Sequence, residues 1–181
     1  MIKKIFIDPG HGGTDNGAAW GDKLNYVEED DANLSIAFFL KYELLLMNDY
    51  QIKLSRETDQ YIHLSERCRL ANEWKASCFI SIHCDAFHNR TVSGMSVHCY
   101  KKNMLAYSLM DQMAWAFPTH KMRGVKESPE FHVLKGTKMK AVLIECEFLS
   151  NLRTRRFLKE PENQVDMAKA IKKGINKFYG G

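Results

Sequence analysis

The stretch FIDPGHGGTDNGA, which runs from Phe6 to Ala18, places a glycine-rich turn directly after a short apolar strand. A single imidazole, that of His11, lies at this turn among four glycines. Such a turn can present backbone N–H groups to an anion, or it can aim a histidine as a metal ligand or a catalytic base. The stretch contains neither GxGxxG nor GxxxxGK[ST], which disfavours a phosphate loop. A plain turn with an incidental histidine is the alternative to a functional one.

Short apolar segments alternate with amphipathic segments along the rest of the chain. The predicted strands are Lys3–Asp8, Gln51–Ser55, Cys78–His83, Met95–Tyr100, Phe131–Leu134 and Ala141–Phe148. The predicted helices are Asp31–Met47, His63–Trp74, Asn103–Phe117 and a last one that begins at Pro161. This alternation predicts a single α/β domain with a mostly parallel central sheet of about six strands and helices on both faces. In such sheets functional residues collect beyond the carboxyl ends of the strands.

Length and composition indicate one ordinary globular domain. The chain has 181 residues, of which 45% are apolar and 27% charged, as in many soluble domains. A net charge of +4 is too small to indicate nucleic-acid binding, but it suits an anionic polymer such as a cell wall. The five cysteines form no CxxC motif, so we expect reduced thiols and no disulfide framework.

Neither an export signal nor a membrane span is expected. The chain passes from Met1-Ile2-Lys3-Lys4 directly into the first strand, without an apolar segment long enough for a secretion signal. The most apolar region, Leu34 to Met47, contains charged residues and is too short and too polar to cross a bilayer.

Ionisable side chains recur near the ends of the predicted strands. His11 follows the first strand, His83 closes CFISIHCDA, and Glu145 and Glu147 lie late in AVLIECEFLSN. An acidic run, residues 28–31, precedes the first helix. Strand-end histidines are commonly polar caps, and acidic residues commonly compensate a helix dipole. Two carboxylates in an apolar strand are harder to dismiss, because buried charges need partners; period two places them on the same side.

Taken together, these residues indicate metal chemistry. Two histidines and a carboxylate supply three nitrogen and oxygen ligands and leave a fourth position open, which is the arrangement of catalytic zinc sites. A separate glutamate would then supply the general acid and base that hydrolysis needs. The sequence contains no HExxH motif, so the helix-borne metalloprotease site is excluded.

The chain resembles the zinc-dependent N-acetylmuramoyl-L-alanine amidases of the Amidase_3 type, which occur in cell-wall autolysins and phage endolysins. Four stretches carry the resemblance, in order: IFIDPGHGGTDNGA, EDDANLSIA, LSRETDQYIHLSERCRLANEWKASCFISIHCDA and AVLIECEFLSN. Together they extend over nearly the whole chain. The resemblance implies one amidase catalytic domain over residues 1–181, with no wall-binding domain in this chain.

The resemblance also implies roles for individual residues. His11, Glu29 and His83 would bind Zn²⁺, and Glu145 would be the catalytic glutamate. Glu29 is chosen because the family's ligand lies four residues before an Asn-Leu pair; Glu28 is the neighbouring alternative. The implied reaction is hydrolysis of the amide between N-acetylmuramic acid and L-alanine in peptidoglycan. The alternative is a zinc peptidase that acts within the stem peptide.

Several residues depart from the family's pattern or lie beside it. The family usually has Gly where this chain has Glu147, and often Asn where it has Asp85. We expect Glu147 to lie past the strand end, solvated; the alternative is a share in proton transfer or contact with a cationic stem-peptide side chain. Asp85 would be an outer partner of His83 if the two meet. Arg56 and Arg67 are expected to form structural ion pairs.

The expected partner is bacterial peptidoglycan, without nucleic acid or membrane insertion, and the expected state is a monomer. The expected absence of an export signal fits an enzyme that is made in the cytoplasm and reaches the wall after release. It also fits a domain excised from a secreted protein. Residues 88–125 hold one predicted strand and one predicted helix, which leaves little room for an inhibitory helix. A wall-binding module without catalysis is disfavoured, because every motif position for metal and base is filled.

Overall fold

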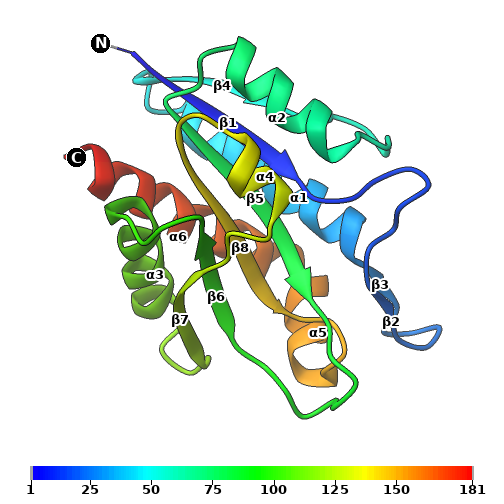
Figure 1. Ribbon diagram of the computed structural model, residues 1–181. Helices are drawn as coiled ribbons and strands as arrows, with labels where there is room; N and C mark the ends of the chain where they lie inside the picture. The colour runs from blue at the N-terminus through cyan, green and yellow to red at the C-terminus, as the bar shows by residue number, and fades with distance from the viewer. Residues whose placement is uncertain (1, 181) are drawn as a thin grey trace.

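The computed structural model describes residues 2–180, and a six-stranded sheet forms the centre of this part of the chain (Figure 1). The strand order is β4-β1-β5-β8-β6-β7. The strands are β1 (Lys3–Pro9), β4 (Tyr50–Leu54), β5 (Cys78–Asp85), β6 (Met95–Cys99), β7 (Met122–Glu127) and β8 (Lys140–Phe148). A separate antiparallel pair, β2 (Ala19–Trp20) and β3 (Val27–Glu28), lies beside this sheet.

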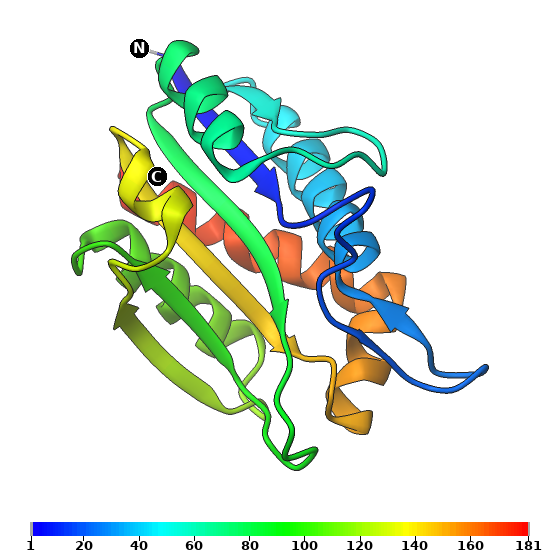
Figure 2. The same ribbon diagram turned by 45° about the vertical axis from the view of Figure 1, so that its right-hand side comes forward.

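Helices cover both faces of the sheet (Figures 1 and 2). Three of them lie on one face: α1 (Glu29–Leu45), α3 (Met104–Ala116) and α6 (Pro161–Tyr179). The other face carries α2 (Leu64–Glu73) and α4 (His132–Gly136), and α5 (Leu152–Lys159) follows the end of β8. Consecutive residues of β1 point to opposite faces of the sheet, and Ile5 and Phe6 accordingly belong to two separate apolar clusters. Because both faces are buried, the central strands read as continuous apolar runs, which confirms the predicted fold class.

The direction of the strands decides where functional residues meet. Strands β4, β1, β5 and β8 run parallel, whereas β6 runs antiparallel to β8 and parallel to β7. The carboxyl ends of β1, β5 and β8 therefore lie at the same edge of the sheet (Figure 1). The register of β5 against β8 shifts between His83 and Asp85, so the chain bulges at this edge.

One predicted strand is wrong. Residues 131–134 lead into and form the first turn of helix α4. A run of four apolar and aromatic residues suits a buried helical turn as well as a strand, and periodicity cannot separate the two over so short a length. The sixth strand of the sheet is β7 instead, an edge strand next to β6 at the end of the strand order. Its sequence, MRGVKE, is too polar to read as a strand.

Helix boundaries also differ in places that matter for the site. Helix α1 begins at Glu29, two residues earlier than predicted, and this brings Glu29 and Asp30 into the buried first turn. Helix α5 was not predicted; its sequence, LRTRRFLK, is strongly charged, and Asn151 caps it by accepting from the backbone of Arg153 and Thr154. No helix within residues 2–180 combines the length and the apolar character that crossing a membrane requires.

Candidate metal centre

The glycine-rich turn after β1 places His11 at the carboxyl edge of the sheet. His11 itself has a φ of 60°, in the left-handed region that non-glycine residues rarely adopt. The turn closes through two hydrogen bonds between the backbones of Gly12 and Asp15, of 2.7 and 3.2 Å. Gly10 lies so close to His83 that a Cβ atom at this position would be 2.2 Å from His83 Cε1. The glycines therefore let the chain turn tightly and pack against the second histidine.

Two buried arginines hold this turn. Arg67 pairs with Asp8, with 2.8 Å between Nη1 and Oδ1, and also donates to the carbonyls of Pro9 and His11. Arg56 donates to the carbonyls of Pro9, Gly10, Asp30 and Thr58. The predicted ion pair of Arg67 is confirmed. That of Arg56 is wrong, because in residues 2–180 its guanidinium binds backbone carbonyls in place of a carboxylate.

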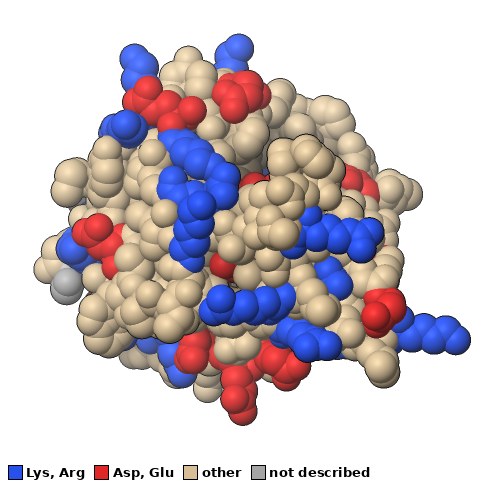
Figure 3. All heavy atoms as spheres, turned by 90° about the horizontal axis from the view of Figure 1, so that it is seen from below, with Lys and Arg blue, Asp and Glu red and all other residues tan. Residues whose placement is uncertain are grey.

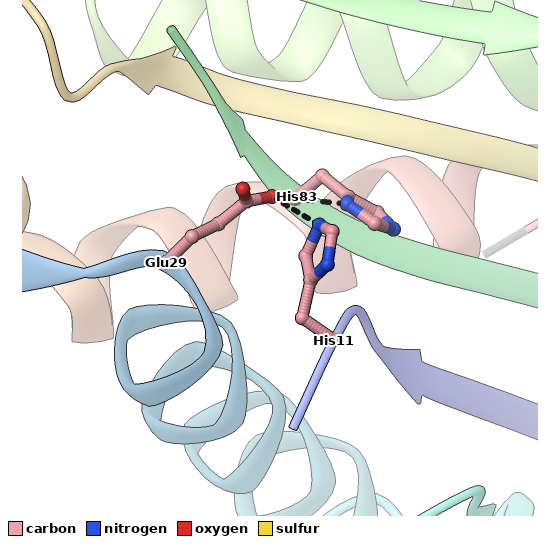
Figure 4. Close-up of side chains that lie close together, drawn as sticks. All are labelled: His11, Glu29 and His83. Atoms are coloured by element: carbon pink, nitrogen blue, oxygen red, sulfur yellow. Dashed lines mark hydrogen bonds and ion pairs between the residues drawn. The ribbon is translucent and has the colours of Figure 1, made fainter. Parts of the chain in front are cut away.

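His11, Glu29 and His83 meet at the carboxyl ends of β1 and β5 (Figure 4). Glu29 Oε1 lies 3.2 Å from His11 Nε2 and 3.0 Å from His83 Nδ1. One ligand atom from each residue lies within 4.8 Å of the other two. Two imidazole nitrogens and a carboxylate oxygen are the donor types of a catalytic zinc site. The side chains thus fit a metal ion in chemistry and in spacing.

Glu29, rather than Glu28, faces the two histidines. Its second oxygen, Oε2, accepts from the backbone N–H of Ala18 at 2.8 Å, which fixes the carboxylate in a buried position. The carboxylate of Glu28 points elsewhere: its Oε1 accepts from Asn16 Nδ2 at 3.0 Å and from the hydroxyl of Tyr26 at 2.9 Å. The early start of α1 therefore selects which of the two adjacent glutamates meets the histidines.

Charge is concentrated within this cluster. Burial raises the pKa of Glu29, but the hydrogen bonds and charges of His11 and His83 together hold it below its usual range. Burial likewise lowers the pKa of His11, yet contacts with Glu29 and Asp15 raise it to about 9. Asp15 Oδ2 lies 3.0 Å from His11 Nδ1, within ion-pair distance. The geometry is not that of a hydrogen bond within residues 2–180. A carboxylate at the far nitrogen is typical of metal-binding histidines, and the sequence reasoning had not identified Asp15.

Glu145 lies next to this cluster, on the neighbouring strand. It is the register partner of His83 in the pairing of β5 with β8. Its Oε2 atom is buried and has no hydrogen-bond partner within residues 2–180. Burial, together with the negative charges of Glu29 and Asp85, raises its pKa well above the usual range. Glu145 therefore has the raised proton affinity that is typical of groups that take up and release protons at functional sites.

A cavity of about 370 Å³ joins Glu145 to the histidines. Its walls are mainly apolar: Tyr61, Ile62, Leu64, Phe131, Val133 and Leu143. Phe131 and Val133 come from the start of α4, the segment that was predicted as a strand. The cavity therefore presents an apolar surface next to ionisable groups, as ligand sites commonly do.

Two carboxylates lie differently from expectation. Glu147 is only 1% exposed, and its Oε2 accepts from the backbone N–H of Gly94 at 2.6 Å while Oε1 lies 3.0 Å from His120 Nδ1. The expected solvated position is wrong, because Gly94 and His120 pack against the carboxylate and bury it. Asp85 Oδ1 accepts from the backbone N–H of Ala86 at 2.7 Å. His83 Nδ1 forms its hydrogen bond with Glu29 Oε1. Within residues 2–180, Asp85 therefore forms no hydrogen bond or ion pair with His83.

Known proteins resemble this chain along most of its length. The profile of the Amidase_3 family, N-acetylmuramoyl-L-alanine amidase, matches residues 5–177. The N-acetylmuramoyl-L-alanine amidase CwlM of Bacillus licheniformis is 32% identical over 97% of this chain and 68% of its own length. The probable cell wall amidase LytH of Staphylococcus aureus is 30% identical over 98% of this chain and 58% of its own length.

A solved structure shows the same fold. The N-acetylmuramoyl-L-alanine amidase from Clostridium difficile 630 superposes with a TM-score of 0.91 and 33% identity, over 98% of this chain and 97% of that one. Against the longer relative LytH, by contrast, this chain spans little more than half of the length.

Proposed function

The chain belongs to the N-acetylmuramoyl-L-alanine amidase family and is an amidase of the bacterial cell wall, and we propose that His11, Glu29 and His83 bind the zinc ion on which its reaction depends. The bond hydrolysed is the amide between N-acetylmuramic acid and L-alanine in peptidoglycan. Glu145 is the group that moves the proton in this reaction.

The observation that carries the proposal is a glutamate beside the ligand cluster with one buried, unpartnered carboxylate oxygen. Glu145 Oε2 has no hydrogen-bond partner within residues 2–180, and it lines the same cavity as His11 and His83. Burying a polar atom without a partner destabilises the folded state. Such an atom is therefore expected at a functional position, where a substrate or a water molecule completes its hydrogen bonding.

The residues divide the chemistry between them. A zinc ion, when bound, supplies Lewis acidity that activates water and polarises the amide carbonyl. The carboxylate of Glu145 accepts a proton from the attacking water and passes it to the nitrogen of L-alanine as the amide bond breaks. A raised pKa suits both steps, since the same group must take up the proton and then give it away.

The surroundings keep these groups in position. The backbone N–H of Ala18 holds Glu29 Oε2, and Asp15 lies at the far nitrogen of His11. The apolar walls of the cavity lie beside Glu145, and burial of its carboxyl group keeps its proton affinity high.

The two adjacent glutamates provide a sharp test of the ligand assignment. We expect Glu29→Gln to lose bound zinc and to lose the release of new amino termini from purified peptidoglycan. The matched variant Glu28→Gln should keep both, because Glu28 faces Asn16 and Tyr26. Elemental analysis of the purified proteins gives the zinc content, and circular dichroism verifies that both variants fold. Zinc loss in Glu28→Gln with full zinc in Glu29→Gln would overturn the assignment.

A further inference from the structure

A row of polar side chains crosses the sheet on the face that carries the metal cluster. His83 on β5 pairs with Glu145 on β8, and Glu145 pairs with Ser96 on β6. Residues directly opposite each other on neighbouring strands point to the same face. The row continues to Lys126 on β7, whose Nζ lies 3.5 Å from Ser96 Oγ. Moving away from the metal cluster, the order is therefore Glu145, Ser96 and Lys126.

Lys126 is a half-buried cation that forms no ion pair within residues 2–180. No carboxylate oxygen of these residues lies within 4.0 Å of its ammonium, and its one side-chain hydrogen bond is with Ser96 Oγ. Burial and the charge of Arg123 lower the pKa of Lys126, while the more distant carboxylates of Asp85 and Glu145 raise it. Its neighbour Arg123 is engaged, with its guanidinium over the ring of Phe148 and a bond to the carbonyl of Ser93. Lys126 is thus a cation that can receive an external anion.

Buried hydroxyls and an imidazole hold this ammonium in place. Lysine only donates hydrogen bonds, so Ser96 Oγ accepts from Lys126 and can donate to His98 Nε2 at 3.1 Å. The other nitrogen of His98 then donates to Ser128 Oγ at 2.7 Å. Burial, and next to it the charge of Lys126, lowers the pKa of His98 to about 4, so its ring is neutral. Phe131 stacks on this ring with 5.2 Å between centroids, which completes a rigid support.

The order of the row sets the direction in which a substrate lies. Glu145 gives its proton to the amine of L-alanine, so the stem peptide leaves on the Glu145 side of the metal cluster. Neighbouring strands lie about 4.8 Å apart, which places the ammonium at Ser96 roughly one strand spacing beyond Glu145. In peptidoglycan the second stem residue is a glutamate joined through its side-chain carboxyl. Its α-carboxyl group lies about two residues, roughly 7 Å, from the scissile amide.

We propose that Lys126 binds the α-carboxylate of the second stem-peptide residue and makes the enzyme prefer peptides in which this carboxylate is not amidated. The proposal rests on the proposed function, since it takes the amide next to L-alanine as the bond that is cut. The surroundings are suitable for an anionic ligand: Figure 3 shows Lys and Arg side chains spread over the middle of the face at which β5 and β8 end, with Asp and Glu mainly toward its rim.

The test uses two synthetic muramoyl peptides that differ only in this group. One carries a free α-carboxylate on the second residue, and the other carries the α-carboxamide. The wild-type chain, loaded with zinc, should cleave the carboxylate form with a kcat/KM about tenfold higher, the worth of one charge-assisted hydrogen bond. Lys126→Met should lose this preference by slowing cleavage of the carboxylate form alone, and Lys126→Arg should keep most of it.

Lys140→Met is the matched control, because Lys140 is an exposed lysine at the opposite end of β8, and it should keep the wild-type preference. Equal kcat/KM of the wild-type chain for both peptides would overturn the proposal without any variant. An equal loss on both peptides in a folded Lys126→Met protein would also overturn it. If the wild-type chain cleaves neither peptide, the proposed function itself fails, and the role of Lys126 fails with it.

Discussion

Glu145 combines a buried, unpartnered oxygen with a position beside three side chains that suit a metal. Its role in proton transfer is separable from metal binding, because its carboxylate is not one of the ligand group. We predict that Glu145→Gln lowers kcat by about 10²–10⁴-fold and leaves the zinc content unchanged. Peptidoglycan hydrolysis assays with elemental analysis of the same samples measure both quantities. A Glu145→Gln protein of normal activity would exclude this residue as the base.

Gly10 sets the distance between the turn and His83. A Cβ atom at Gly10 would lie 2.2 Å from His83 Cε1, so Gly10→Ala must displace the imidazole. We predict zinc affinity weakened by about 10–100-fold, the range seen when groups that orient a ligand are disturbed, as measured by calorimetric titration.

The control for this prediction is Gly124→Ala. Among residues 2–180, no heavy atom beyond those of Gly124 and its two chain neighbours lies within 4 Å of its Cβ position, although its φ of +81° strains an alanine. This variant should lose some stability and keep wild-type zinc affinity. Unchanged zinc affinity in Gly10→Ala would show that His83 is not held by this contact.

At the level of elements, the turn after β1 depends on α2, which supplies Arg67. The ion pair of Arg67 with Asp8 is buried on both sides, and removing one member leaves an uncompensated charge. We predict that Arg67→Met lowers the free energy of unfolding by about 3–5 kcal/mol, as measured by denaturant unfolding.

Arg69 on the same helix is the comparison for this prediction. It is exposed, and its partners Glu66 and Glu73 are exposed as well, so Arg69→Met should change stability little. Equal losses in the two variants would mean that the buried pair contributes no more than a surface pair.

The elements that carry the metal cluster could be predicted from the sequence, and some others could not. Buried parallel strands such as β1, β5 and β8 are continuous apolar runs, so their ends, and His11 and His83 with them, were found. The edge strand β7 and the helix α4 carry no such signal, because the sequence of β7 is polar and α4 is too short for its periodicity to be recognised. The cavity wall at Phe131 and the row that reaches Lys126 depend on these two elements and on strand register. They therefore had to be seen in the structure.

Within the site, too, local sequence patterns could be predicted, whereas features that depend on where an element begins or which segments meet could not. Glu29 was identified by its spacing from an Asn-Leu pair, whereas its separation from Glu28 depends on where α1 begins. Asp15 lies beside His11 only because the turn closes between Gly12 and Asp15. Glu147 was expected in solvent because its partners, Gly94 and His120, are distant in the sequence, and no pattern in the chain predicts that they meet the end of β8.

For the molecule as a whole, the charged cluster links stability to pH when no metal is bound. The pKa of His11 rises from 6.5 to about 9 on folding. A raised folded pKa gives stability that is fully present below pH 6.5 and is lost as the pH rises through about 9. We predict that the melting temperature of the metal-free chain decreases as the pH is raised from 6.5 to about 9. Calorimetry with chelator present measures this decrease.

The variant His11→Gln isolates this contribution. It has no imidazole to titrate, so its melting temperature should fall less over the same pH range. An identical fall in both proteins would assign the pH dependence to other groups, such as buried thiols, whose pKa values are raised by burial.

The most direct measurement of the central claim uses the wild-type chain and purified peptidoglycan, with chelator and then with added zinc. New amino termini are quantified and the residue that bears each one is identified. We predict that chelation stops the release of termini and that zinc restores it, with L-alanine at every new terminus. New termini within the stem peptide, or release that continues without metal, would contradict a zinc amidase built on His11, Glu29 and His83.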